Sequence, residues 1–172
     1  MKSKIKQLLP APLLKLLRER RLANQRRSFD RSLQRAISST AKPNLASPAR
    51  SLLILPSDPR DITGAVGDDA MLSAAVEHFA SACPALQVSL LCLPGTPEEI
   101  VRRRGWQPVR IPQLSSFPES MARLFASGEY DPFVVLGADV MDGYYNPDYT
   151  KQILVAADLS PKSGLRTINL GF

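Results

Sequence analysis

The chain has 172 residues, enough for one domain with a sizeable hydrophobic core but few for two. Hydrophobic residues make up 44% of it and charged residues 22%, which argues against wholesale disorder, and no apolar run approaches the roughly 18 residues of a membrane-spanning helix. The net charge of +6 is uneven, because residues 1–50 hold 13 Lys and Arg against two acids, whereas residues 51–172 hold 9 against 14. We therefore predict a basic extension and linker over residues 1–50 and an acidic domain over residues 51–172.

The extension is predicted to contain a helix from Leu13 to Ile37, where leucines alternate with basic side chains. Such a helix suits three alternatives: contact with an anionic membrane surface or a protein partner, phosphate contacts with nucleic acid, or a solvated extension. Nucleic acid is disfavoured, because no aromatic residue precedes Phe29 and no known nucleic-acid-binding motif is present. Residues 38–49, SSTAKPNLASPA, are small, polar and proline-containing, which is typical of a linker.

The predicted location is the cytoplasm. Pro10, Pro12 and Lys15 interrupt the apolar part of the N-terminus and no small-residue cleavage site follows, so we expect no secretory signal. Cys83 and Cys92 are isolated in apolar contexts and are predicted to be buried, reduced thiols. The membrane alternative for the extension would place the protein peripherally at the inner face of the membrane.

From Ser51 onwards, short apolar runs alternate with stretches of helical periodicity. The predicted strands cover residues 51–56, 86–93, 106–112, 131–139 and 165–172, and the predicted helices cover residues 68–82, 96–105, 117–128 and 146–160. Alternation of this kind predicts an α/β, Rossmann-like fold: a parallel sheet of about five strands with helices on both faces, preceded by the basic helical extension. Prolines place the strand at 106–112 at an edge. Ligands of such sheets bind beyond the carboxyl ends of the strands.

The helix predicted at residues 96–105 has the clearest boundaries. Pro97 lies in its first turn and Gly105 just beyond its end, as helix starts and stops require. Arginines at 102–104 complement the helix dipole and are predicted to form a solvated face.

The stretch DPRDITGAVGDDAM, residues 58–71, follows the first predicted strand. Gly64 and Gly67 allow backbone angles and a close ligand approach that other residues resist. Asp68 is predicted to cap the next helix and Asp69 to lie in its first turn, where a negative charge is favoured. These carboxylates disfavour a phosphate cradle, and neither GxGxxG nor GxxxxGK[ST] is present. Two interpretations remain: a capped turn, or a loop that binds a ligand.

A second loop, GADVMDGYYN at residues 137–146, follows the fourth predicted strand. Asp139 and Asp142 are candidates either for metal ligation or for accepting hydrogen bonds from hydroxyl groups, and Tyr144 is a candidate for stacking on a sugar ring. The alternative is a polar turn followed by core aromatics. His78 lies within a predicted helix and is predicted to be a packing or surface residue. No catalytic residue, cofactor or metal ion is assigned.

Together, PSDPRDITGAVGDDAM, VVLGADVMDGYY and LRTINLGF resemble the amino-terminal half of the polysaccharide pyruvyl transferase family, over about residues 51–172. The family's Gly-Asp-acid-Ala helix start corresponds to residues 67–70. Its glycine-rich turn after a later strand, commonly three glycines, corresponds to Gly137, Ala138 and Asp139. Two of those three positions depart from the family's pattern, and the basic extension lies outside the resemblance.

The family transfers the pyruvyl group of phosphoenolpyruvate to two hydroxyls of a sugar in a cell-envelope or extracellular polysaccharide. The resemblance implies a two-lobed fold in which this chain is the first lobe and mainly binds the glycan acceptor. It also implies that the cations that hold phosphoenolpyruvate, and an acid/base histidine, belong to the other half, so that the chain by itself is inactive. The predicted substrate-binding residues of the two loops are Gly64, Gly67, Asp68, Asp69, Gly137, Asp139, Asp142 and Tyr144.

Two other classes of function stay open. One is a glycosyltransferase-like lobe that uses a nucleotide sugar, and the other is a non-catalytic lobe that binds a glycan or a protein partner. The chain ends on Phe172, directly after the last predicted strand, which we interpret as typical of one lobe of a longer protein.

Overall fold

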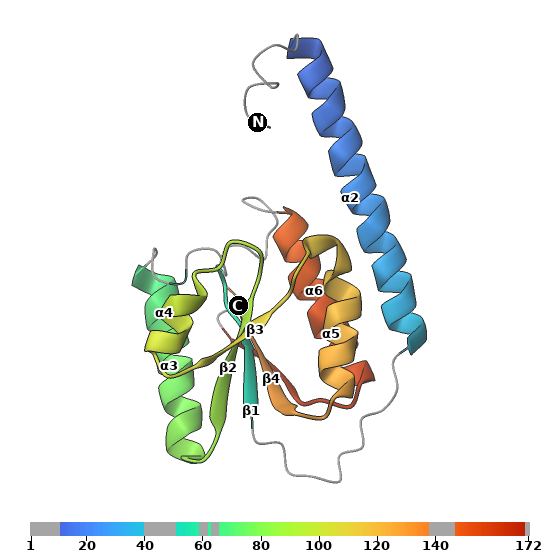
Figure 1. Cartoon of the computed structure of the whole chain (residues 1–172). Helices are drawn as coiled ribbons and strands as arrows, with labels where there is room; N and C mark the ends of the chain where they lie inside the picture. Colours follow the sequence, from blue (N-terminus) through green and yellow to red (C-terminus); the bar gives the residue numbers. More distant parts are fainter. Residues whose placement is uncertain (1–10, 40–50, 59–61, 63–65, 138–146, 171–172) are drawn as a thin grey trace.

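The structure is a computed structural model that describes residues 11–39, 51–58, 62, 66–137 and 147–170. Its centre is a five-stranded parallel sheet with the strand order β3-β2-β1-β4-β5 (Figure 1). The strands are β1 (Ser51–Leu55), β2 (Gln87–Cys92), β3 (Gln107–Arg110), β4 (Tyr130–Leu136) and β5 (Thr167–Leu170). The helices are α2 (Ala11–Ser39), α3 (Val66–Ala82), α4 (Glu98–Arg103), η1 (Leu114–Ser116), α5 (Phe117–Ala126) and α6 (Pro147–Lys162).

This architecture confirms the predicted Rossmann-like fold and the edge position of β3. The observed boundaries of the elements differ from the predicted ones by a few residues. The strand predicted at 131–139 begins one residue earlier and its regular part ends at Leu136, and the helix predicted from Asp68 begins at Val66. Gly105 follows α4 with a φ of 74°, a conformation that glycine adopts without strain.

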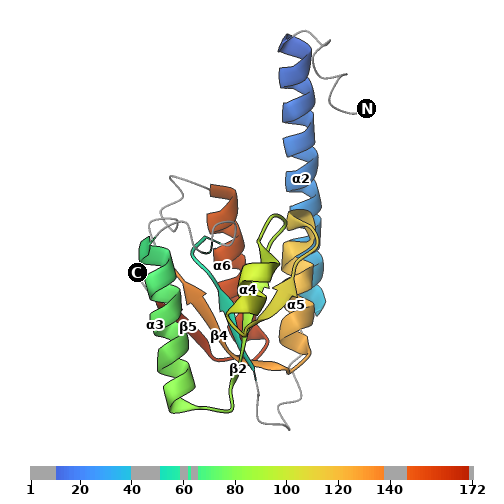
Figure 2. The same cartoon turned by 60° about the vertical axis from the view of Figure 1, so that its left-hand side comes forward.

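Helices cover both faces of the sheet: α3 and α4 lie on one side, and α5 and α6 lie on the other (Figures 1 and 2). Because side chains alternate along a strand, β1 serves two cores. Leu52 and Ile54 pack with Leu72 of α3, whereas Leu53 and Leu55 belong to the cluster around α5 and α6. Large side chains that are fully buried concentrate in the second cluster, which includes Phe117, Phe125 and Phe133.

The long helix α2 is attached to this second face. Its C-terminal part packs on α5, η1 and α6, while its N-terminal part projects past the sheet (Figures 1 and 2). Phe29, Ser32 and Ala36 are buried, and Phe29 and Ala36 belong to the α5–α6 core. The end of the basic extension is therefore part of the hydrophobic core.

The cysteine prediction is half right. Cys92 is fully buried in β2, and burial raises the pKa of its thiol to about 11. Cys83 is exposed just after α3, so its apolar sequence context did not lead to burial.

Candidate functional site

The strand order reverses between β1 and β4. The chain leaves β1 toward α3 on one face and leaves β4 toward α6 on the other, and in folds of this kind ligands bind beyond the carboxyl ends of the strands at such a point. The residues next to this point are Ser57 and Asp58 after β1, the first turn of α3, and the first turn of α6. The sequence prediction of ligand-binding loops points to the same end of the sheet.

Ser57, Asp68 and Tyr149 surround the end of β1. The Ser57 hydroxyl is buried and donates a hydrogen bond to Asp68 Oδ1 at 2.8 Å. The buried Tyr149 hydroxyl donates to the carbonyl oxygen of Pro56. Burial raises the pKa of Tyr149 well above its ordinary value, and the negative charges of Asp58 and Asp68 raise it further, so the phenol keeps its proton.

The role predicted for Asp68 as a helix cap is wrong. Because α3 begins at Val66, Asp68 is the third residue of the helix, and its carboxylate reaches back to Ser57. A negative charge in the first turn still favours the helix, by about 0.3–1 kcal/mol in general. Asp68 therefore links α3 to the end of β1 and places a partly exposed carboxylate at that end of the sheet.

Asp69 turns to a different partner. Its Oδ1 lies 2.5 Å from a terminal guanidinium nitrogen of Arg104, and that guanidinium lies 5.1 Å from the centroid of the Trp106 ring. The side chains of Asp69 and Arg104 are 35% and 25% exposed, so this pair is shielded from water more than a surface ion pair is. Arg102 and Arg103 are exposed and pair with acids of α4 itself, as the predicted solvated face requires. Arg104 is largely shielded, so the prediction fails for this residue.

The predicted glycines have ordinary structural surroundings. Gly67 lies inside α3, and a Cβ added there would meet no atom within 4 Å. Neither a positive φ nor a close neighbour among the described residues requires glycine at that position. Gly137 is buried, and its N–H donates to the Leu170 carbonyl oxygen at 2.7 Å, which continues the pairing of β4 with β5. Gly64, Asp139, Asp142 and Tyr144 lie outside the described residues.

Sequence reasoning missed Ser57 and Tyr149. Their positions in the sequence could have identified both as candidates for the site. Ser57 follows the buried strand β1 by two residues, and Tyr149 lies in the first turn of the helix that follows β4. His78 was predicted correctly, since it is exposed and its ring contacts only Phe79 edge-on at 5.6 Å among the rings that the structure describes.

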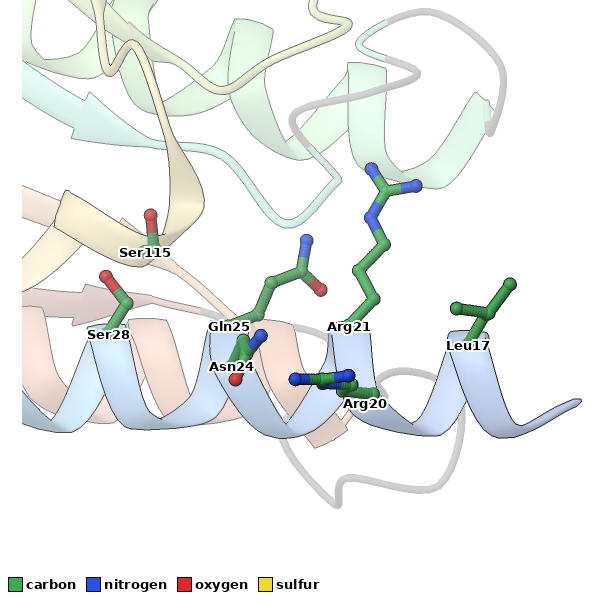
Figure 3. Close-up of a pocket in the computed structure, with 7 residues that line it drawn as sticks. All are labelled: Leu17, Arg20, Arg21, Asn24, Gln25, Ser28 and Ser115. Carbon is green, nitrogen blue, oxygen red and sulfur yellow. The ribbon is translucent and has the colours of Figure 1, made fainter. Parts of the chain in front are cut away.

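A second feature lies on α2. A groove of about 400 Å³ follows this helix from Leu17 to Ser28 and meets Ser115 of η1 (Figure 3). Arg20 and Arg21, which line this groove, extend from the helix in different directions (Figure 3). In the described part of the chain, no carboxylate forms an ion pair with either of them.

Comparison of the chain with models of protein families, with curated proteins and with solved structures finds no match. None of the helices in the described ranges combines the length and the apolar character that crossing a membrane requires. The described residues also contain no group of three or more His, Cys, Asp or Glu side chains placed to hold a metal ion.

Proposed function

We propose that the chain binds a hydroxyl-rich glycan at the carboxyl end of β1, as the acceptor-binding lobe of a polysaccharide pyruvyl transferase-like enzyme. The observation that carries the sugar site is the grouping of Asp68, Asp58 and the Ser57 hydroxyl at the reversal of the strand order. Carboxylate and hydroxyl oxygens accept hydrogen bonds from sugar hydroxyls. A carboxylate that is half-exposed keeps acceptor capacity for a ligand after it has received one hydrogen bond from serine.

The same site disfavours an anionic ligand. Arg104 pairs with Asp69, the neighbour of Asp68, and its guanidinium lies over the Trp106 ring, so this cation is already engaged. A donor such as phosphoenolpyruvate carries phosphate and carboxylate charges that need unengaged Arg or Lys groups. The proposed role of this site is therefore to hold the acceptor sugar.

In the reaction that the resemblance implies, two sugar hydroxyls add to C2 of phosphoenolpyruvate. The methylene carbon takes the proton of one hydroxyl and becomes a methyl group, and phosphate leaves with the proton of the other. The product is a pyruvyl ketal. A carboxylate beside an acceptor hydroxyl stabilises the developing positive charge on that oxygen and orients it.

The sugar site is tested by ligand-observed NMR on the full chain with neutral hexoses and short bacterial glycans. Asp68→Asn is expected to weaken binding about tenfold, because it removes the charge that strengthens the hydrogen bond. Asp158→Asn, an exposed acid of α6 that pairs with Lys162, is the matched control and is expected to change nothing. Equal loss in both variants, or no binding of any glycan, contradicts the proposed site.

The pyruvyl transfer is tested separately. Phosphate release from phosphoenolpyruvate is measured with and without a glycan that binds. Release that requires the glycan and falls in Asp68→Asn supports the transferase assignment. Glycan binding without release from any donor favours the non-catalytic alternative, and release from a nucleotide sugar favours the glycosyltransferase alternative.

We further propose that α2 brings the protein to the inner face of an anionic membrane. The projecting part of α2 exposes Leu13, Leu16 and Leu17 at 41%, 60% and 48%. The cations of the same part, Lys15, Arg18, Arg20 and Arg21, have no ion-pair partner among the described residues. Basic side chains near an anionic bilayer contribute about 1 kcal/mol each, and leucines add apolar burial.

Flotation with vesicles that contain anionic lipid tests this contact. Arg18, Arg20 and Arg21 are changed together to Gln, and the control changes Arg103, Arg123 and Lys162 to Gln, which removes the same charge from exposed positions on α4, α5 and α6. We expect loss of flotation only in the first variant, and loss of binding at high salt in the wild type. Equal flotation of both variants contradicts the proposal.

A further inference from the structure

A cavity of about 380 Å³ lies between α2 and the carboxyl ends of β2 and β3. Three parts of the fold enclose it: the middle of α2, the turns that follow β2 and β3, and the first two turns of α6. This volume is within the range of about 300–1,000 Å³ that is typical of small-molecule sites. The cavity is distinct from the cluster at the end of β1, although α6 contributes to both.

The walls of the cavity present mainly apolar surface. Leu22 and Phe29 come from α2, Pro94 follows β2, and Pro112 and Leu114 follow β3. Phe29 is 8% exposed, and Lys151 Nζ lies 4.7 Å from the centroid of its ring. Apolar walls of this kind suit a flat ring better than a sugar, whose hydroxyls would lose water without finding partners.

Gln152 supplies an unusual polar group in this apolar setting. The residue lines the cavity, is 3% exposed, and its Oε1 accepts no hydrogen bond from any residue that the structure describes. A buried acceptor without a donor costs free energy, because water no longer bonds to it. A ligand with an N–H group would satisfy this oxygen. Gln25 and Gln113 add two more amides to the lining, each able to donate and to accept.

Positive charge lies at the same cavity. Arg26 is exposed and has no ion-pair partner among the described residues, and Lys151 pairs with Asp30 at 3.0 Å, with both side chains partly in solvent. Guanidinium and ammonium groups bind phosphate through charge-assisted hydrogen bonds. Asp148 is the acid in the lining, and it is exposed in the first turn of α6.

We propose that this cavity binds a nucleoside monophosphate or the nucleotide part of a larger ligand. The base lies between the apolar walls, an N–H of its edge donates to Gln152 Oε1, and the phosphate meets Arg26, the lining cation that no described acid engages. Amide side chains recognise base edges because they present a donor and an acceptor side by side, the geometry by which Gln reads adenine. The inference does not depend on the glycan site, since Asp68 and Ser57 take no part in the cavity.

Isothermal titration of the full chain with AMP, GMP, CMP and UMP tests the proposal. At least one nucleotide is expected to bind, and both its nucleoside and ribose 5-phosphate are expected to bind at least about tenfold more weakly. Inorganic phosphate that binds as tightly as the nucleotide overturns the proposal, and so does the failure of all four nucleotides to bind.

Two variants assign the binding to this cavity. Arg26→Gln is expected to weaken the nucleotide about tenfold and to leave the nucleoside unchanged, whereas Arg27→Gln, which removes the same charge from an exposed position of the same helix outside the cavity lining, is expected to change neither. Gln152→Leu is expected to weaken both ligands while keeping or raising the melting temperature of the free chain, because it removes a buried acceptor without a described donor. Equal effects of the two arginine variants overturn the assignment, whether or not the glycan site exists.

Discussion

The two halves of α2 have opposite environments. Leu13, Leu16 and Leu17 in the first half are exposed, whereas Phe29, Ser32 and Ala36 in the second half are buried. The first half is richer in leucine, yet the second half is the one that joins the core. The buried residues follow the i, i+3, i+7 spacing of one helix face and meet α5 and α6. Burial along this helix is therefore decided by the presence of a packing partner.

The largest expected effect comes from removing the aromatic anchor of the packed half. Phe29→Ala is expected to lower the free energy of unfolding by about 3 kcal/mol, because it leaves a cavity between α2 and the body. Urea unfolding followed by circular dichroism measures the change. Leu16→Ala in the projecting half is the control, expected within about 0.5 kcal/mol of wild type. Similar losses in the two variants would remove the distinction between the halves.

A smaller effect is expected for the hydrogen bond that joins the packed half to α5. The fully buried Ser32 Oγ accepts a hydrogen bond from the Glu119 N–H at 3.1 Å, in the first turn of α5, where the helix itself offers no acceptor. Ser32→Ala is expected to cost about 1–2 kcal/mol by the same unfolding measurement. Ser28→Ala, one turn earlier on α2, is expected to cost less than Ser32→Ala, and the reverse order would contradict this role.

The ion pairs at the same contact predict a pH dependence. Glu119 accepts a hydrogen bond from Arg123 at 2.6 Å and lies 3.4 Å from Arg35 of α2. The hydrogen bond from Arg123, with the charges of Arg35 and Arg123, lowers the pKa of Glu119 from its ordinary value of 4.5. A lowered pKa in the folded state stabilises the fold above pH 4.5, and this contribution disappears as the pH falls below that value.

Glu119→Gln is therefore expected to be less stable than wild type at neutral pH and to approach it on acidification. Melting temperatures between pH 3 and pH 7 measure the difference. Glu77→Gln on α3 is the control, and a constant gap between Glu119→Gln and wild type across this range would show that the carboxylate charge has no part in the contact.

The smallest effect on stability is expected in the projecting half. Leu16→Ser with Leu17→Ser is expected to change the free energy of unfolding by less than about 0.5 kcal/mol, because both side chains already face solvent. The same double variant is expected to reduce vesicle flotation, since the leucines supply the apolar part of the proposed membrane contact. A large loss of stability would mean that this half also has a packing partner.

The sequence alone allowed most of the fold to be predicted. Alternating strands and helices, the edge position of β3 and the end of α4 before Gly105 all followed from local patterns that the structure confirms. The predicted start of α4 was wrong, because the helix begins at Glu98 and Pro97 is its N-cap instead of lying in its first turn. Exposure of Cys83 did not follow, because an apolar sequence neighbourhood does not say whether another element covers the end of α3.

The sequence predicted at which end of the sheet the candidate site lies, but it did not predict which residues contact one another there. Asp68 does lie at the carboxyl end of β1, as the loop pattern predicted. Its partner Ser57 is eleven residues away in the sequence, Arg104 approaches Asp69 from α4, and Tyr149 reaches Pro56 from α6. Such contacts join separate elements, so no local pattern contains them.

The amino-acid sequence by itself determined where helices and strands form, because hydrophobic periodicity and the placement of proline and glycine act within a few residues of the chain. It also determined that positive charge gathers before residue 50 and negative charge after it. Only the tertiary structure decided that Asp68 and Asp69 turn to different partners, that the end of α2 joins the core, and that α2, the ends of β2 and β3, and α6 enclose a cavity. Those features depend on contacts between residues far apart in sequence, which exist only after the sheet has brought its strand ends together.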